Sequence, residues 1–127
     1  MYWWGNGCRH VFRAILIYIE GTKMKRIALV TGGTRGIGAA ISSALQHGGY
    51  TVAATYFGDD EAAKNFSRDT GISTYKWSVS DYDSCVMGIK KVEEDLGTID
   101  ILVNNAGITR DAMFHKITFS QWKEVID

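Results

Sequence analysis

Between Ile27 and Val103, four short apolar runs rich in β-forming residues alternate with segments of helical character. This alternation constrains the fold more than any other feature. The runs are Ile27 to Thr31, Thr51 to Tyr56, Ile72 to Val79 and Ile99 to Val103. The first run is continuously apolar, as in a strand that is buried on both faces. Because parallel strands are joined by right-handed helical crossovers, the sequence predicts an α/β fold, a doubly wound parallel sheet of about four strands with flanking helices.

The segments between the strands carry helix start and stop signals. Gly48 would end the first helix and Gly71 the second, which begins with acidic residues at Asp59. Ser80 or Asp81 can cap the third helix. The apolar faces that we expect to meet the sheet are Ile37, Ile41, Ala44 and Leu45 in the first helix and Val86, Ile89, Val92 and Leu96 in the third.

A glycine-rich turn, Thr31-Gly-Gly-Thr-Arg-Gly-Ile-Gly38, joins the first strand to the first helix. Gly32 permits a tight turn, Gly36 lets the backbone approach a pyrophosphate, and Gly38 lets the helix pack close to the strand. The start of the helix offers free N–H groups and a positive dipole end to phosphates. Because the turn lies between a buried strand and an amphipathic helix, the context favours dinucleotide binding. The candidate cofactor-binding residues here are Gly32, Thr34, Arg35, Gly36, Ile37 and Gly38.

A second glycine motif, Asn104-Asn-Ala-Gly107, follows the fourth strand. Ligands on doubly wound sheets bind outside the carboxyl ends of the strands, at the point where the strand order reverses. Both glycine motifs follow the carboxyl ends of strands, so we expect them to lie together at one nucleotide site.

The pattern Thr31-Gly-x-x-x-Gly-x-Gly38, taken with Asn104-Asn-Ala-Gly107, resembles the short-chain dehydrogenase/reductase family, and the resemblance extends over residues 24–127. It implies the amino-terminal half of a Rossmann-like domain that binds a nicotinamide dinucleotide, and a homotetramer for the full-length parent. Residues 104–118 with Trp122 resemble those reductases of the family that act on 3-oxoacyl thioesters. Within that group, residues 113–116 favour acetoacetyl-CoA over an acyl-carrier-protein thioester as the small-molecule substrate.

The resemblance also implies where other residues lie along the cofactor. Ser78, Val79 and Ser80 match the segment beside the adenine, although the family usually has Asp in place of Ser78, so we expect backbone contact there. The loop along the ribose and nicotinamide matches Asn105, Ala106, Gly107, Ile108 and Thr109. Asn104 either braces the sheet or has a role in the site. Asp111 matches a position near the substrate, or is only an acid at a helix start.

The charge at the tip of the second strand predicts the form of the cofactor. An NAD-specific site places an acid there, which accepts hydrogen bonds from the ribose 2′-hydroxyl and repels a 2′-phosphate. Thr55 and Tyr56 occupy this tip, with Tyr56 expected to contact the cofactor, while Asp59 and Asp60 are assigned to the following helix. Arg35 is the candidate partner of a 2′-phosphate, or else a solvated loop charge. The prediction is therefore NADPH.

The catalytic residues that the family uses cannot be matched in this sequence. The resemblance implies a tyrosine, a lysine, a serine and an asparagine, and we expect all of them beyond Asp127. Tyr75 and Lys76 are adjacent in a predicted strand, so their side chains point to opposite faces and cannot substitute. We therefore expect the full-length parent to be the reductase and this chain alone to be inactive.

A second interpretation makes the chain a non-catalytic nucleotide-binding module or an interaction partner of full-length reductases. The partner would then contact Phe119, Trp122, Val125 and Ile126 in the last segment. Against this, the apolar strand 99–103 would be left as an exposed edge, which natural domains seldom leave. The edge favours the enzyme hypothesis.

Composition and the amino-terminal segment argue against several other classes. The 127 residues carry a formal net charge of +0, so no basic excess points to nucleic acid. Cys8 and Cys85 are far apart, which favours a reducing cytoplasm over a disulfide framework, and Cys8 with His10 lacks the second pair that a zinc site needs.

Residues 1–23 do not resemble a domain, and their apolar run is too short to span a membrane. They are either a leader before a true start at Met24 or a poor secretory signal.

Overall fold

The computed structural model describes residues 25–108 and 112–126. These residues form β1 (Ile27–Val30), α2 (Gly36–His47), β2 (Thr51–Tyr56), α3 (Asp60–Thr70), β3 (Ser73–Lys76), α4 (Tyr82–Asp95), β4 (Ile99–Val103), the 3₁₀ turn η1 (Phe114–Lys116) and α5 (Phe119–Ile126). The proposed leader, 1–23, lies outside the described residues, as do Thr109 and Asp111. Among the helices described, none has the length and apolar character needed to cross a membrane.

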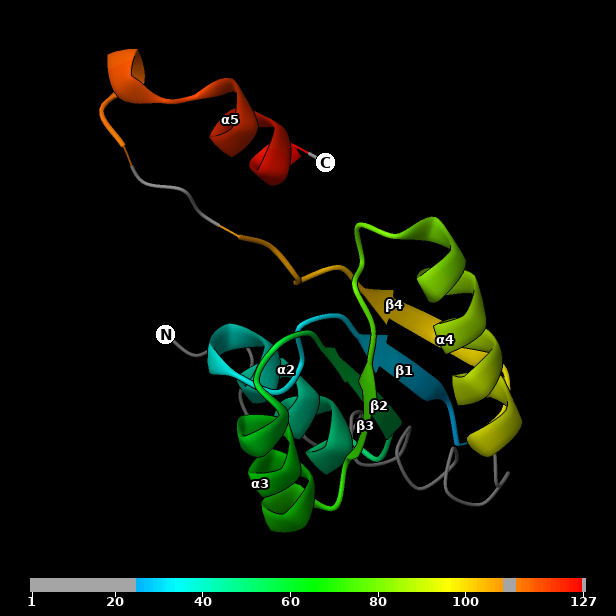
Figure 1. Ribbon diagram of the computed structural model, residues 1–127. Helices are drawn as coiled ribbons and strands as arrows, with labels where there is room; N and C mark the ends of the chain where they lie inside the picture. Colours follow the sequence, from blue (N-terminus) through cyan, green and yellow to red (C-terminus); the bar gives the residue numbers. More distant parts are fainter. Residues whose placement is uncertain (1–24, 109–111, 127) are drawn as a thin grey trace, which may run out of the picture.

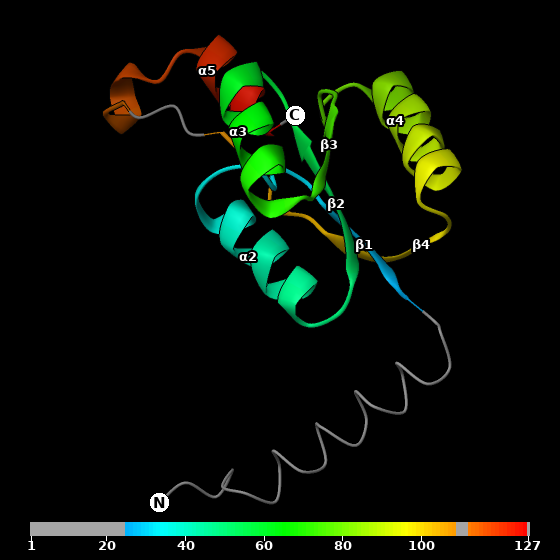
Figure 2. The same ribbon diagram turned by 90° about the horizontal axis from the view of Figure 1, so that it is seen from below.

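The sheet is parallel throughout, with the strand order β3-β2-β1-β4. The sheet extends from β1 to one side through β2 and β3 and to the other side through β4. The strand order therefore reverses at β1. Figures 1 and 2 show α2 and α3 on one face of the sheet and α4 on the other. This arrangement confirms the predicted doubly wound, Rossmann-like α/β fold.

The core has two halves because successive side chains of a strand point to opposite faces of the sheet. All of β1 is buried, as its uninterrupted apolar run predicts. Leu29 joins a buried cluster on one face that contains Val92 of α4. Val30 joins the cluster on the other face, against which Ile41 of α2 and Phe66 of α3 pack. The glycine turn therefore starts from a strand that is held on both sides.

The face that α2 presents to the sheet is only partly the predicted one. Ile41 and Leu45 pack against the core as expected, but Ile37 is 76% exposed and Ala44 is also exposed. The buried residues of the helix are instead Gly38 and Ser42. Small side chains let the helix approach the strands closely, so the contact face is set by size as much as by apolar character.

The contact face of α4 also agrees only in part with the predicted one. Val92 is buried and Leu96 packs against the core as expected, but Ile89 is 39% exposed and Val86 is only half-buried. Gly88 faces the core in their place, because a Cβ there would overlap the ring of Trp77. The large indole ring thus requires a residue without a side chain opposite it.

Strand β3 does not reach Val79, where the sequence predicted its end. The Trp77 N–H still donates to the Tyr56 carbonyl at 3.1 Å, but β2 ends at Tyr56 and offers no further residues to pair with. The Ser78 carbonyl instead accepts a hydrogen bond from the Asp81 N–H at 3.3 Å, which begins the turn into α4. Asp81 then caps that helix, as one of the two predicted alternatives.

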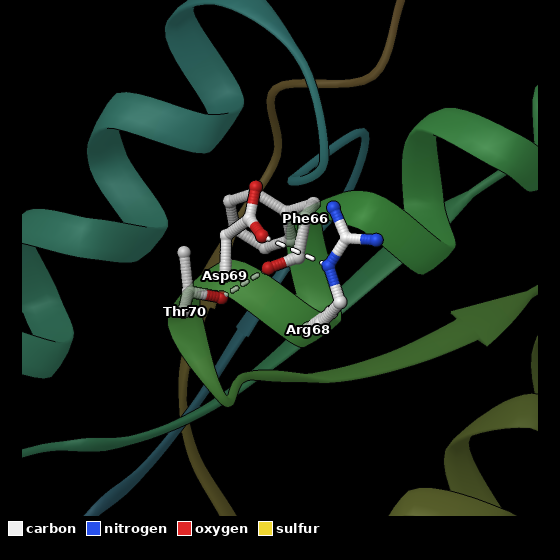
Figure 3. A network of polar contacts seen from close by, with 4 residues as sticks. All are labelled: Phe66, Arg68, Asp69 and Thr70. Atoms are coloured by element: carbon white, nitrogen blue, oxygen red, sulfur yellow. Dashed lines mark hydrogen bonds and ion pairs between the residues drawn. The ribbon is translucent and has the colours of Figure 1, made fainter.

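Helix α3 ends where the sequence predicts, at Gly71, whose φ of 73° is left-handed. Thr70 Oγ1 donates to the Phe66 carbonyl at 2.7 Å within the last turn (Figure 3). Arg68 Nε lies 3.1 Å from Asp69 Oδ1 on the exposed side of the same turn. These local contacts fix the helix end, and the chain turns directly into β3.

Strand β4 lies at the edge of the sheet and is more exposed than the buried strand that we expected. Its residues alternate between half-buried and exposed, and Leu102 is 56% exposed. At its start the register with β1 shifts, and Asp100 Oδ2 accepts a hydrogen bond from the Ile27 N–H at 2.9 Å. Strand β4 is therefore the exposed apolar edge that we expected where no further strand covers it, and not a strand buried on both faces.

Candidate functional site

The two glycine motifs meet through the hydroxyl group of Thr31, the residue that follows β1. Its Oγ1 accepts hydrogen bonds from the N–H groups of Asn105 and Ala106, both at 3.0 Å, and donates to the Val103 carbonyl at 3.3 Å. A hydroxyl group has one donor and two acceptor positions, so all of them are used. The loops after β1 and β4 are therefore held together as one unit.

Asn105 ties the same two loops through its side chain. Its Nδ2 donates to the carbonyl groups of Thr31 and Gly32, at 3.1 and 3.2 Å. Bracing was one of the two alternatives for Asn104, but that residue is exposed and the bracing contacts are made by Asn105. Neighbouring residues of an extended segment point to opposite sides, so only one of the two asparagines can face the glycine turn.

Glycine is required at several positions of the turn, and at Gly36 it also leaves open space. Gly32 has a φ of 62°, a conformation that other residues rarely adopt. A Cβ on Gly38 would lie 2.6 Å from Asn105 Nδ2 and would overlap the Gly32 carbonyl. Gly36 has a φ of 52° and only open space where a Cβ would be. The turn is therefore tight against α2 yet open at the start of that helix.

Two further hydrogen bonds, which the motif did not predict, connect the glycine turn to α2 and to β2. Ser42 Oγ donates to the Gly33 carbonyl at 3.0 Å in a buried contact between α2 and the turn. The Gly33 N–H donates to the Thr55 carbonyl at 3.0 Å and connects the turn to β2. The turn is thus bonded to a helix and to a neighbouring strand.

The amino terminus of α2 has no side-chain cap. Its N-cap residue is Arg35, which makes no capping hydrogen bond, and no acidic residue lies in the first turn. The Ala39 N–H bonds to the Arg35 carbonyl at 3.1 Å, so the amide groups of Gly36 to Gly38 precede the helical ladder. Free amide groups and the positive end of the helix dipole form a site for an anion.

A cleft of about 1040 Å³ opens beside this helix start, a volume slightly above the usual range for a small-molecule or cofactor site. Its wall combines both glycine motifs with the ends of β2 and β3 and one side of α5. In Figure 1, β1 and β4 point toward the side of the molecule on which α5 lies. The predicted cofactor residues on this wall are Gly32, Thr34, Arg35, Tyr56, Ser78, Val79, Ser80, Asn105, Ala106, Gly107 and Ile108.

Other predicted site residues are placed differently. Gly36, Ile37 and Gly38 form the first turn of α2 and are not on the cleft wall. The Ile37 side chain is largely exposed, whereas Gly38 is buried against the glycine turn. Thr109 and Asp111, which we expected near the nicotinamide and the substrate, lie outside the described residues.

The wall also contains residues that the sequence did not single out as site residues, namely Thr55, Phe57, Asp59, Trp77, Ser120, Lys123, Glu124, Val125 and Ile126. Thr55 could have been found, because it lies at a strand tip beside the motif, and its Oγ1 accepts a hydrogen bond from the Gly32 N–H at 3.4 Å. Of the α5 residues, Val125 and Ile126 were expected only as contacts for a partner protein, and none was expected at a cofactor site. Their place at the cleft depends on tertiary structure alone.

The acidic residues that follow β2 are engaged in local contacts. Asp59 Oδ1 accepts a hydrogen bond from the Ala62 N–H at 2.9 Å as the cap of α3. Asp60 Oδ1 lies 2.8 Å from Lys76 Nζ, and hydrogen bonding from Lys76 lowers the pKa of Asp60. Burial, together with the nearby Asp60 carboxylate, raises the pKa of Tyr56, so that residue presents a neutral hydroxyl group at neutral pH.

Tyr75 and Lys76 extend toward different helices. Tyr75 Oη donates to Asp95 Oδ2 of α4 at 3.2 Å, whereas Lys76 reaches Asp60 at the start of α3. The two side chains therefore do not meet at one site. Over residues 25–108 and 112–126, no group of three or more His, Cys, Asp or Glu residues is arranged to hold a metal ion.

Known proteins are similar to this sequence over most of its length. A family model described as short chain dehydrogenase matches residues 26–127. The acetoacetyl-CoA reductase of Paracoccus denitrificans is 71% identical over 104 residues, which are 82% of this chain and 43% of the relative. The acetoacetyl-CoA reductase of Shinella zoogloeoides is 67% identical over 104 residues, with the same coverage of 82% and 43%.

A more distant relative is the 3-oxoacyl-[acyl-carrier-protein] reductase of Staphylococcus aureus, which is 40% identical over 110 residues, or 83% of this chain and 45% of the relative. The chain thus spans less than half the length of the curated relatives that it matches. The family match includes both glycine motifs and the whole parallel sheet. The chain belongs to the short chain dehydrogenase family of oxidoreductases.

Proposed function

We propose that the protein that carries this sequence reduces a 3-oxoacyl thioester with NADPH, and that its substrate is acetoacetyl-CoA. The observation that carries the proposal is the 71% identity to the acetoacetyl-CoA reductase of Paracoccus denitrificans. The acyl-carrier-protein reductase of Staphylococcus aureus is only 40% identical, which favours the CoA thioester over the carrier-bound one.

The proposed cofactor contacts begin at the start of α2. Its uncapped amide groups would hold the pyrophosphate, as the positive end of a helix dipole favours. The open space at Gly36 supports this fit, because no side chain stands between a phosphate and those amides. When bound, NADPH supplies the hydride that the carbonyl carbon of the substrate accepts.

The choice of NADPH over NADH is supported by the charges near the tip of β2. Arg35 lines the cleft and offers paired donors to a 2′-phosphate. Asp59 and Asp60, which could repel that phosphate, are bonded to a backbone amide and to Lys76. Tyr56 presents a neutral group on the same wall.

The remaining wall residues would follow the rest of the cofactor. The segment 78–80 would border the adenine, and the loop that begins at Asn105 would border the ribose and nicotinamide. The side chain of Asn105 contributes by holding that loop against Gly32. Thr109 is proposed to continue the loop, and Asp111 to lie near the substrate.

The direct test measures the rate at which the purified full-length protein oxidises NADPH. The rate with acetoacetyl-CoA is compared with the rate with the acetoacetyl thioester of acyl carrier protein. We expect faster turnover with the CoA thioester and tighter binding of NADPH than of NADH. Preference for the carrier-bound substrate would reassign the enzyme, and absence of nucleotide binding would contradict the proposal. The 127-residue polypeptide alone is expected to bind NADPH without turnover.

A further inference from the structure

An ion pair connects the start of α3 to the end of β3. Lys76 Nζ lies 2.8 Å from Asp60 Oδ1 and 2.9 Å from Asp60 Oδ2, so the ammonium group is shared by both carboxylate oxygens. The side chains of Asp60 and Lys76 are 51% and 48% exposed. A pair this exposed contributes little to folding stability.

Asp60 and Lys76 are not on the cleft wall, but Asp60 neighbours residues that are. Tyr56, at the tip of β2, lines the cleft and interacts with the Asp60 carboxylate. Asp59, the neighbour of Asp60, is also on the cleft wall. In NAD-specific sites an acid at the tip of the second strand selects NADH. Asp60 resembles that acid, because it lies just beyond the tip of β2 and contacts Tyr56, the last residue of the strand.

A carboxylate in this place would act against NADPH. It would repel the two negative charges of a 2′-phosphate, and it could accept a hydrogen bond from the 2′-hydroxyl of NADH. The ammonium group of Lys76 neutralises that charge at hydrogen-bond distance. Lys64, one turn further along α3, adds a weaker electrostatic attraction to Asp60.

We propose that Lys76 determines cofactor specificity by neutralising Asp60, so that the end of the cleft accepts a 2′-phosphate. This inference rests on the proposed use of NADPH. Lys76 acts as a positioning and shielding residue for Asp60 and does not itself bind the phosphate. Arg35 remains the group that contacts the phosphate.

The experiment compares the dissociation constants of NADPH and NADH for the wild-type protein and for Lys76→Met, Asp60→Asn and Asp60→Asn/Lys76→Met, by fluorescence titration at low ionic strength. Lys76→Met exposes the carboxylate and should lower the preference for NADPH about tenfold, an effect that should shrink at high salt. The double variant should recover the wild-type preference, because no charge is left to shield. Asp60→Asn alone should keep that preference.

The matched control is Lys91→Met, which breaks an ion pair of similar length, 2.9 Å to Asp95, within α4 and without the contact to Tyr56 that Asp60 makes. It should leave the preference unchanged. If Lys76→Met left the preference intact, the inference would be wrong. If the double variant stayed as weak for NADPH as Lys76→Met, Lys76 would be a direct phosphate ligand and the shielding role would be overturned. A wild-type protein that binds both dinucleotides equally would instead contradict the proposed use of NADPH.

Discussion

The helices α2, α3 and α4 each follow the carboxyl end of a strand, yet their amino termini are built in two different ways. Asp59 caps α3 and Asp81 caps α4, and each of these helices has an acidic residue in its first turn. Helix α2 begins at Arg35 with neither a side-chain cap nor an acid. Its first turn contains glycine at 36 and 38 in place of polar side chains.

The difference separates a stabilising role from a binding role. In α3 and α4 the protein satisfies its own amide groups, and a missing cap typically costs a helix about 1 kcal/mol. In α2 the same amide groups remain available beside the cleft, where an anion can satisfy them. Variants that alter one kind of terminus and leave the other intact can test this separation.

The largest effect is expected from Gly38→Ala, which disrupts the contact between α2 and the glycine turn. The added Cβ would overlap the Gly32 carbonyl and lie 2.6 Å from Asn105 Nδ2, and such overpacking costs about 3 kcal/mol. Chemical denaturation measures the loss, and nucleotide binding should disappear with it. In the control, Gly36→Ala, the new methyl group has open space, so only the strain of a φ of 52° remains, about 1 kcal/mol. Equal losses in the two variants would contradict this account.

Arg35→Ala should come next, with an effect on binding alone. Loss of the charged hydrogen bonds to a 2′-phosphate should weaken NADPH binding roughly thirtyfold and leave NADH binding unchanged. The melting temperature should not change, because Arg35 is exposed and makes no capping bond. Titration with both dinucleotides checks the ratio, and an equal loss for both would remove the assignment of Arg35 to the 2′-phosphate.

Asp81→Ala should produce the opposite pattern. The Asp81 carboxylate accepts hydrogen bonds from the backbone N–H and the hydroxyl group of Ser84 at the start of α4. Its removal should lower the melting temperature by a few degrees and leave the affinity for NADPH unchanged. Weaker nucleotide binding at unchanged stability would show that the capped termini are not purely structural.

The smallest effect concerns pH. Hydrogen bonds lower the pKa values of three carboxyl groups below 3.8, from Lys76 to Asp60, from Ser84 to Asp81 and from Lys91 to Asp95. Groups with a lowered folded-state pKa stabilise the fold above the unfolded value, and that stability is lost as pH falls through the folded values. Unfolding free energy should therefore be flat between about pH 5 and pH 9 and decline below about pH 4. A decline that begins near pH 6 would contradict these assignments.

The fold could be predicted because its signals are local. The uninterrupted run of β1, the left-handed Gly71 and the cap at Asp81 each act within a few residues, and the structure has all three. The predicted contact faces of α2 and α4 were partly wrong, because packing against the sheet decides which residues are buried. Trp77 lies across from Gly88, and neither residue shows its partner in the sequence.

The site shows the same division. The meeting of the two glycine motifs follows from parallel topology, since carboxyl ends of neighbouring strands share one edge. The role of Thr31 as the shared hydrogen-bonding group, and of Asn105 in place of Asn104, depends on side-chain directions that the motif does not specify. The contribution of α5 to the cleft depends on tertiary structure alone.

The central claim is that the free amide groups of α2 hold the cofactor phosphates. Replacing Arg35 by a residue that caps these amide groups tests the claim most directly. Arg35 has the extended conformation of an N-cap residue, so Arg35→Asp would give α2 the same kind of cap as α3 and α4. The measurement is NADH affinity in Arg35→Asp against Arg35→Ala, because NADH lacks the 2′-phosphate. We predict that Arg35→Ala retains NADH, while Arg35→Asp loses it at an equal or higher melting temperature. Equal NADH affinity in the two variants would contradict the claim.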